Sequence, residues 1–284
     1  MSMEAKNHFP DLILFPNPIG KPASDVCDNL AMKLFLKENN VAFVGGLLSL
    51  PSYCTKVKLD VGLSVNAPQS AIWLNREPNL FVYGFEPVAR NREAIFSGNH
   101  QWPTKLNPAL IGERIEIIPC ALGQKSIAGG LRMFITKTDP GCSSLLEPIG
   151  MEIDYMETVP VFSLGDFLSY FPFQRIRQIE HLKIDVQGAD FEVLLGTREF
   201  LKKIMAITIE IDTSNYVATR NSSLSIGFYL LKRGFLRIRH RASWIFICKI
   251  FGKVLTVETD DPTYLNLRFL LARTTDSLSL FQRG

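Results

Sequence analysis

The segment His181–Gly196 constrains the fold of this chain more than any other, because a strand pattern changes into a helix pattern across an acidic turn. Apolar residues first alternate with polar ones, at Leu182, Ile184 and Val186. After an interruption at residues 187–190, apolar residues return at helical spacing. A carboxylate between a strand and a helix, here Asp185, is typical of the ligand-binding edge of an open α/β sheet. The sequence therefore predicts an enzyme or a cofactor-binding protein.

The same succession of strand and helix patterns is repeated along most of the chain. Further strands are expected at residues 56–61, 79–84, 114–119, 131–136, 158–162 and 204–211. Helices are expected at residues 69–75, 89–96, 163–168 and 224–232, with an exit turn at 120–123. Residues 236–239 and 264–271 are expected to close the sheet as an antiparallel pair. Strands separated by helices predict an α/β fold with a mostly parallel sheet.

The N-terminal part of the chain has a different pattern. Residues 1–24 contain four prolines, which disfavour a regular helix and predict an arm along the surface. A helix capped by Asp25 is expected next, with its apolar stripe formed by Val26, Leu30, Leu34 and Phe35. Since no Gly- or Ser-rich linker divides the rest, we expect an arm and helix at 1–55 and one domain at 56–284.

Composition excludes several classes of protein. The chain has 284 residues, of which 46% are hydrophobic, so it can bury a full-sized core. Lys and Arg total 31 and Asp and Glu 28, a balance that favours neither a nucleic-acid nor a membrane partner. The five cysteines and four histidines are scattered without metal-ligand or CxxC spacing, so no metal site or disulfide framework is predicted. With neither a signal-peptide pattern nor a membrane-spanning stretch, a cytoplasmic location is expected.

Three acids lie at the ends of predicted strands: Asp60, Glu86 and Asp185. The carboxyl ends of parallel strands share one edge of a sheet, so these side chains are expected to converge on one crevice. Glu86 follows Asp60 by 26 positions (86 − 60), a spacing that suits a carboxylate accepting hydrogen bonds from the two hydroxyls of a ribose. Both NAD and S-adenosylmethionine contain such a ribose. The turn at 60–70 has only one glycine, Gly62, which disfavours the pyrophosphate of a dinucleotide and leaves S-adenosylmethionine.

A series of motifs makes the interpretation more specific. In chain order they are DVGLSVNAPQS, VYGFEPVARN, IPCALG, GCSSL, VFSLGDFL, LKIDVQGADFEVLLG and ITIEID. Over residues 57–271 their order and spacing resemble the FkbM-like family of S-adenosylmethionine-dependent methyltransferases. The resemblance implies a Rossmann-like class I methyltransferase fold, with a seven-stranded, mostly parallel sheet, helices on both faces and an antiparallel last strand. It also implies transfer of a methyl group to a hydroxyl of a sugar, glycan or related small metabolite.

The resemblance also implies roles for individual residues. Asp60 and Gly62 would line the methionine end of S-adenosylmethionine, with a polar contact from Ser64. Glu86 with Pro87 would hold the ribose, Cys120 and Ala121 would flank the adenine, and Ser144 would belong to a loop over the cofactor. Asp185 would lie near the transferred methyl group. Asp185 is the first candidate for the general base, and His181 is the second.

Several of these residues also have simpler interpretations. Asp185 could cap the following helix, His181 could be an exposed turn residue, and Glu210 could be either structural or substrate-facing. The family's first turn usually reads Asp-x-Gly-Ala-Asn-x-Gly, whereas this chain has Leu63, Ser64 and Asn66 at the Ala, Asn and second Gly positions. The Asn66 side chain is expected to crowd the cofactor. A non-catalytic cofactor-binding or scaffold protein is therefore the alternative hypothesis, and the sequence indicates no oligomeric state.

Overall fold

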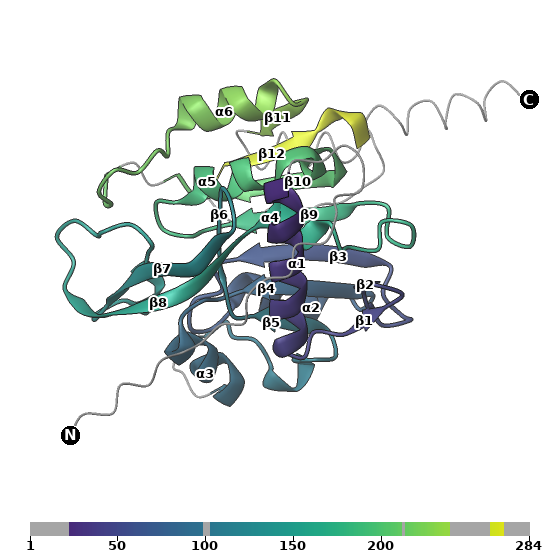
Figure 1. Cartoon of the computed structure of the whole chain (residues 1–284), viewed down its shortest axis with the longest axis horizontal. Helices are drawn as coiled ribbons and strands as arrows, with labels where there is room; N and C mark the ends of the chain where they lie inside the picture. The colour runs from purple at the N-terminus through teal and green to yellow at the C-terminus, as the bar shows by residue number, and fades with distance from the viewer. Residues whose placement is uncertain (1–22, 99–102, 212–213, 239–261, 270–284) are drawn as a thin grey trace, which may run out of the picture.

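The structure, a computed structural model, describes residues 23–98, 103–211, 214–238 and 262–269. Its centre is a seven-stranded sheet in the order β11-β12-β10-β9-β3-β4-β5 (Figure 1). The strands are β3 (Lys56–Val61), β4 (Leu80–Phe85), β5 (Ile115–Ile118), β9 (Ile179–Ile184), β10 (Ile204–Ile209), β11 (Phe235–Ile238) and β12 (Thr263–Asn266). Strand β12 is antiparallel to both of its neighbours, and the other pairs are parallel. The predicted Rossmann-like fold is confirmed.

Six α-helices and three short 3-10 helices are described. The α-helices are α1 (Ala23–Glu38), α2 (Pro68–Arg76), α3 (Ala89–Ser97), α4 (Leu164–Leu168), α5 (Asp190–Gly196) and α6 (Ser223–Leu231). The 3-10 helices are η1 (Pro108–Leu110), η2 (Pro140–Cys142) and η3 (Arg198–Lys203). Local chemistry explains where they begin: Pro68 starts α2, and the Ser163 hydroxyl accepts a hydrogen bond from the Asp166 N–H at the start of α4.

Two smaller sheets accompany the central one. Strands β1 (Phe43–Val44) and β2 (Leu47–Leu48) form a short hairpin. The other sheet has the order β6-β8-β7, with β6 at Ala121–Gly123, β7 at Ile127–Thr136 and β8 at Ile153–Ser163. Residues 120–123 are thus largely a strand, where the sequence predicted an exit turn. The sheet extends away from the central one and places residues of β6 and β7 beside the strand ends (Figure 1).

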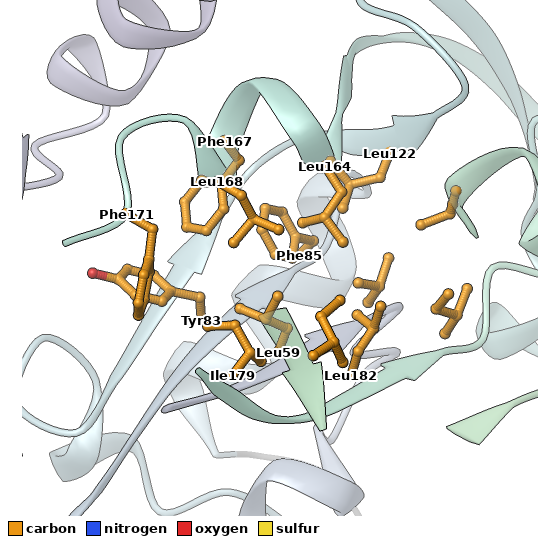
Figure 2. Packing of buried hydrophobic residues seen from close by; sticks show 14 of the residues in the cluster. Leu59, Tyr83, Phe85, Leu122, Leu164, Phe167, Leu168, Phe171, Ile179 and Leu182 are labelled. Carbon is orange, nitrogen blue, oxygen red and sulfur yellow. The ribbon is translucent and has the colours of Figure 1, made fainter. Parts of the chain in front are cut away.

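One face of the central sheet packs on a core in which aromatic rings meet edge to face. Leu59, Tyr83, Phe85 and Leu182 point from the strands toward α4 (Figure 2). The Phe167 ring of α4 lies 5.1 Å from the Tyr83 ring and 5.2 Å from the Phe85 ring, centroid to centroid. Such pairs contribute about 0.5–1.5 kcal/mol beyond the area that they bury. This packing fixes the carboxyl ends of β3 and β4, from which the site is built.

The predicted apolar stripe of α1 is wrong at Leu30 and Leu34, whereas Phe35 packs against the core as predicted. Leu30 and Leu34 are about half exposed, at 49% and 51%, whereas Met32 and Leu36 are fully buried. Both pairs have the same four-residue spacing, so periodicity could not choose between the two faces of the helix. The Tyr170 hydroxyl donates a hydrogen bond to the Asn29 carbonyl oxygen at 2.7 Å, which helps to set the rotation of α1. The side chain of Val26 and the arm at 1–22 lie outside the described residues.

The opposite face of the sheet carries a buried row of polar side chains. It runs across β3, β9 and β10 and consists of Lys58, Asp60, His181, Lys183 and Thr208. Helix α2 covers part of this row: Ser70 Oγ donates a 2.6 Å hydrogen bond to Asp60 Oδ2, and the Trp73 ring lies 5.2 Å from the His181 ring.

None of the described helices has both the length and the hydrophobicity required to cross a bilayer. The boundary proposed at residue 56 stays a prediction.

Candidate active site

A cavity of about 670 Å³ lies at the carboxyl ends of β3, β4 and β9. Residues 139–143, 145 and 103–104 contribute to its walls, together with the start of β6 and Met133 of β7. The charged side chains that line it are all acidic: Glu86, Asp139, Asp185 and Glu210. Among the described residues of the wall there is no Lys, Arg or His. The cavity therefore favours a cationic ligand over an anionic one.

Gly62 brings the turn after β3 into contact with the end of β9. Its backbone has a φ of +88°, and its N–H donates a 3.0 Å hydrogen bond to the Phe85 carbonyl oxygen. A Cβ at this position would lie 1.8 Å from the Asp185 carbonyl oxygen, so a side chain would push the two segments apart. Glycine is required here for both conformation and space.

The Glu86 carboxylate is buried at the end of β4 and borders the cavity. Its Oε2 accepts a hydrogen bond from the Ser64 N–H at 2.8 Å, and its Oε1 accepts from the Val88 N–H at 3.0 Å and Asn91 Nδ2 at 3.2 Å. A carboxylate has about four acceptor positions, so these bonds leave capacity for a ligand. Burial raises the pKa of Glu86 to about 7, although these donors oppose the increase. The adjacent Pro87 also lines the cavity.

A second acidic group lies across the cavity, where one amide nitrogen joins two carboxylates. Gln187 Nε2 donates to Asp185 Oδ1 at 2.8 Å and to Glu210 Oε2 at 2.7 Å. Gln187 itself has a φ of +58°, and its Oε1 accepts a hydrogen bond from the Tyr216 hydroxyl at 2.7 Å. A glutamate at position 187 would place a third carboxylate here. The glutamine instead lets the two acids lie side by side.

Lys183 neutralises one member of this acidic pair. Its Nζ lies 2.8 Å from Asp185 Oδ2 and 3.8 Å from Asp60 Oδ1. Burial raises the pKa of Asp185, but the Lys183 charge and hydrogen bonds with Glu210, Lys183 and Gln187 outweigh it and lower the pKa to about 2. Asp185 is therefore a carboxylate throughout the physiological pH range.

A family model described as the Methyltransferase FkbM domain matches residues 67–236, which is more than half of the chain. The chain belongs to the FkbM methyltransferase family. The predicted membership is thus confirmed, and the chain contains a methyltransferase domain. No curated protein matches this sequence. The matched region includes Glu86, Asp185 and Glu210 and begins just after the turn that contains Gly62.

This FkbM domain accommodates its unusual first turn by packing. Leu63 is buried and points behind the turn, toward Gly84 of β4. A Cβ on residue 84 would lie 2.7 Å from Leu63 Cδ1, so the glycine makes room for the leucine. Asn66 lies in the cavity wall, and its Nδ2 donates a 2.9 Å hydrogen bond to the Thr104 carbonyl oxygen. These two departures from the family pattern leave the cavity open.

Besides Glu86, six residues that the sequence predicted for the site lie in the wall of the cavity. They are Gly62, Ser64, Pro87, Cys120, Ala121 and Asp185. Asp60 and Ser144 are buried behind it. Asp60 accepts a hydrogen bond from Ser70, and burial raises its pKa. The Ser144 hydroxyl donates to the Gln187 carbonyl oxygen at 2.6 Å, so it supports the loop that carries the amide bridge. These two residues act on a ligand only through their neighbours.

His181 lies neither in an exposed turn nor at the cavity. It is a buried residue of β9, which begins at Ile179 because the backbone pairs with β10 from that point. Its Nε2 and the Thr208 hydroxyl are hydrogen-bonded at 2.8 Å. Burial and the nearby Lys58 lower its pKa to about 3, so it is a neutral side chain and a weak base. The structure does not bring this candidate base to the site.

Asp185 does not cap the following helix, because α5 has Ala189 at its N-cap and no side-chain cap hydrogen bond; Asp190, its first residue, instead binds the loop that precedes it. Asp190 Oδ1 accepts from the Val186 N–H at 2.9 Å, and Oδ2 accepts from the Gly188 N–H at 3.1 Å and from Asn221 Nδ2 at 2.7 Å. These bonds fold residues 186–190 into a loop and leave Asp185 directed to the cavity.

Sequence reasoning also missed Asn91, whose only signal was its place in the first turn of the helix after Glu86, and Met133, which had none.

Proposed function

We propose that this chain transfers a methyl group from S-adenosylmethionine to a hydroxyl of a sugar, glycan or related small metabolite. The observation that carries the proposal is the charge of the cavity wall, with four carboxylates and no basic residue among those described. S-adenosylmethionine carries a sulfonium, an ammonium and a single carboxylate, so it is a net cation. A dinucleotide would instead bring a pyrophosphate to this acidic wall, without a basic side chain to receive it.

The chemistry of the wall suits the parts of this cofactor. Glu86, with acceptor capacity remaining on its carboxylate, would hold the ribose hydroxyls. Cys120, Ala121, Leu122 and Met133 form an apolar region for the adenine, and the backbone at Gly62 and Ser64 would meet the amino-acid end. A volume of about 670 Å³ lies within the range of roughly 300–1,000 Å³ that is common for small-molecule sites. The residues present therefore fit S-adenosylmethionine.

When bound, S-adenosylmethionine supplies an electrophilic methyl group on a positively charged sulfur. The protein would align the acceptor hydroxyl with that methyl group, exclude water and remove the hydroxyl proton. Alignment of two reactants provides effective molarities of about 10⁵–10⁸ M in favourable cases. The acidic pair Asp185 and Glu210 favours an uncharged acceptor and opposes an acidic one, because a carboxylate or phosphate would meet like charge.

Methyl transfer is tested directly with S-adenosylmethionine that carries a tritiated methyl group. The purified full-length chain is incubated with a pool of glycans and small hydroxylated metabolites, and label in the products is counted after separation. We expect label in a hydroxyl-bearing product, because the cavity is suited to holding both partners. Binding of S-adenosylmethionine without transfer to any fraction would favour the alternative, a non-catalytic cofactor-binding or scaffold protein.

A further inference from the structure

Helix α6 exposes one side that consists of large apolar residues. Leu224, Phe228 and Leu231 are 85%, 59% and 55% exposed, and Leu224 is the most exposed large apolar side chain among the residues that the structure describes. Spacings of four and three positions place the three side chains on one side of the helix. The helix lies at the edge of the molecule, with the edge strand β11 beside it (Figure 1). We call these three residues the α6 stripe.

The other side of α6 is packed and fixes the direction of the stripe. Ile226 and Leu230 are fully buried in the core. The Tyr229 ring packs against the Phe191 ring of α5, with 5.6 Å between the ring centres. Rotation of the helix to bury the stripe would remove these contacts. Single apolar residues are normal on a protein surface, whereas apolar residues gathered on one side indicate contact with another body.

Cations lie at both ends of the α6 stripe. At the end of the helix, Lys232 Nζ lies 4.2 Å from the centre of the Phe228 ring, and Arg233 follows it in the chain. At the start of the helix, Arg237 Nη1 donates a 2.9 Å hydrogen bond to Ser223 Oγ. All three basic residues are exposed. Positive charge therefore flanks the apolar residues.

The charge of this region differs from that of the whole chain. Residues 222–238 contain three basic residues and no acidic one, whereas the whole chain has 31 basic and 28 acidic residues. Arg220, just before this region, lies 3.6 Å from Glu192 and forms an ion pair with it. The balance over the whole chain, from which no membrane partner was expected, thus conceals a basic region around α6.

We propose that α6 docks on the surface of a bilayer that contains anionic lipids. The α6 stripe enters the region between the head groups, and Lys232, Arg233 and Arg237 lie beside the lipid phosphates. Binding of this kind combines buried apolar area with the attraction between basic residues and anionic lipids. Because α6 has nine residues and a span needs about 20, the helix lies on the bilayer and does not cross it. This inference goes beyond the proposed function and does not depend on methyl transfer.

A second copy of this chain fits the stripe less well than a lipid surface does. In a two-fold symmetric dimer the same residues face one another, so the cations of the two copies would be brought together. Three side chains also supply only a small part of the roughly 800 Å² per partner that a stable interface buries. An anionic bilayer offers opposite charge and an apolar interior for the stripe.

Sedimentation of the full-length chain with lipid vesicles tests this inference. One set of vesicles contains phosphatidylcholine alone, and the other contains equal parts of phosphatidylcholine and phosphatidylglycerol. We expect binding to the anionic vesicles to be at least about tenfold tighter, because each basic residue near an anionic surface contributes about fivefold. Added salt should weaken this binding.

Substitutions separate the stripe from the rest of the surface. Leu224→Ser with Phe228→Ser should weaken binding to the anionic vesicles at least about tenfold, because two apolar side chains no longer leave water. Leu30→Ser with Leu34→Ser, which changes two leucines about half exposed on α1, is the matched control and should leave binding unchanged.

A second pair of variants tests the charge. Lys232→Gln should weaken binding to the anionic vesicles about fivefold. Lys37→Gln removes an exposed cation from the last turn of α1 and should have no effect. Equal losses for the two variants would show attraction by the whole chain, without a docking role for α6, and would overturn the proposal.

The remaining outcomes also decide against the proposal. It is overturned if the full-length chain does not sediment with anionic vesicles, or if the α6 double variant binds them as the unaltered chain does. A melting temperature of this variant clearly below that of the α1 control would show that the rest of the chain covers the stripe. A dimer in light scattering that the variant splits would show that a second copy covers it. None of these results bears on the binding of S-adenosylmethionine.

Discussion

Replacing Gly62 with alanine is expected to disrupt the site and to destabilise the fold. The new Cβ would lie 1.8 Å from the Asp185 carbonyl oxygen, at a backbone φ of +88°. Relief requires β3 and β9 to separate where the cavity begins. We expect a loss of more than about 4 kcal/mol in the free energy of unfolding, which is the range reached only by severe steric or packing defects. Denaturant titration followed by circular dichroism measures this loss.

Gly112→Ala is the matched control for the Gly62 substitution. Gly112 also has a positive φ, +80°, but no atom lies within 4 Å of an added Cβ. Its substitution should therefore cost only the conformational strain, about 1–2 kcal/mol. Equal losses for the two variants would show that the contact with Asp185 has no importance, and would contradict the account of the turn.

Lowering the pH below 7 is expected to weaken the binding of S-adenosylmethionine, because the Glu86 carboxyl then gains a proton. The pKa of Glu86 is about 7, raised by burial. A neutral carboxyl accepts hydrogen bonds from ribose less strongly than a carboxylate does. The affinity should fall as the pH drops below about 7 and level off once Glu86 is fully protonated, at a loss no larger than that of Glu86→Ala, and calorimetric titration at several pH values measures it.

Substitution of Glu86 tests the same contact without a change of pH. Glu86→Ala removes a charge-assisted hydrogen bond, so the affinity for S-adenosylmethionine should fall by about 1.5–3 kcal/mol, or roughly ten- to hundredfold. Glu86→Gln should also remove most of the pH dependence of S-adenosylmethionine binding. Glu199→Gln, which removes an exposed carboxylate of η3, is the control, and unchanged affinity in both Glu86 variants would remove Glu86 from the binding site.

The raised pKa of Glu86 also has a consequence for folding. A carboxyl whose pKa is raised in the folded protein contributes stability that is present below the unfolded value, 4.5, and is lost as the pH rises through about 7. A shift of this size corresponds to roughly 3 kcal/mol. The ligand-free chain thus holds Glu86 at a cost in stability, which a ligand that donates hydrogen bonds would offset.

The strand and helix succession was predictable because its hydrophobic patterns are local. The sequence could not predict which face of a strand meets the cavity, because the central strands are buried on both sides. Val61 and Asp60 are adjacent, yet Val61 lines the cavity and Asp60 lies behind it, against α2. His181 belongs to the same hidden row of polar residues, and alternation cannot tell the two faces apart when both are covered.

The acidic turns at Glu86 and Asp185 were found because each combines a strand end with a carboxylate. Their partners depend on contacts between distant segments. Gln187 joins Asp185 to Glu210, and Glu210 lies 23 positions after Gln187 in the chain. Leu63 fits only because residue 84 has no side chain. Such pairings are decided by tertiary packing, for which local propensity carries no signal.

Calorimetric titration of the full-length chain with S-adenosylmethionine, and separately with NAD, tests the central claim most directly. The account expects a saturable heat for S-adenosylmethionine, reduced at least tenfold in affinity by Glu86→Ala, and no saturable heat for NAD. An absence of binding to S-adenosylmethionine in a chain whose circular dichroism shows it folded, or tighter binding of NAD, would contradict the account.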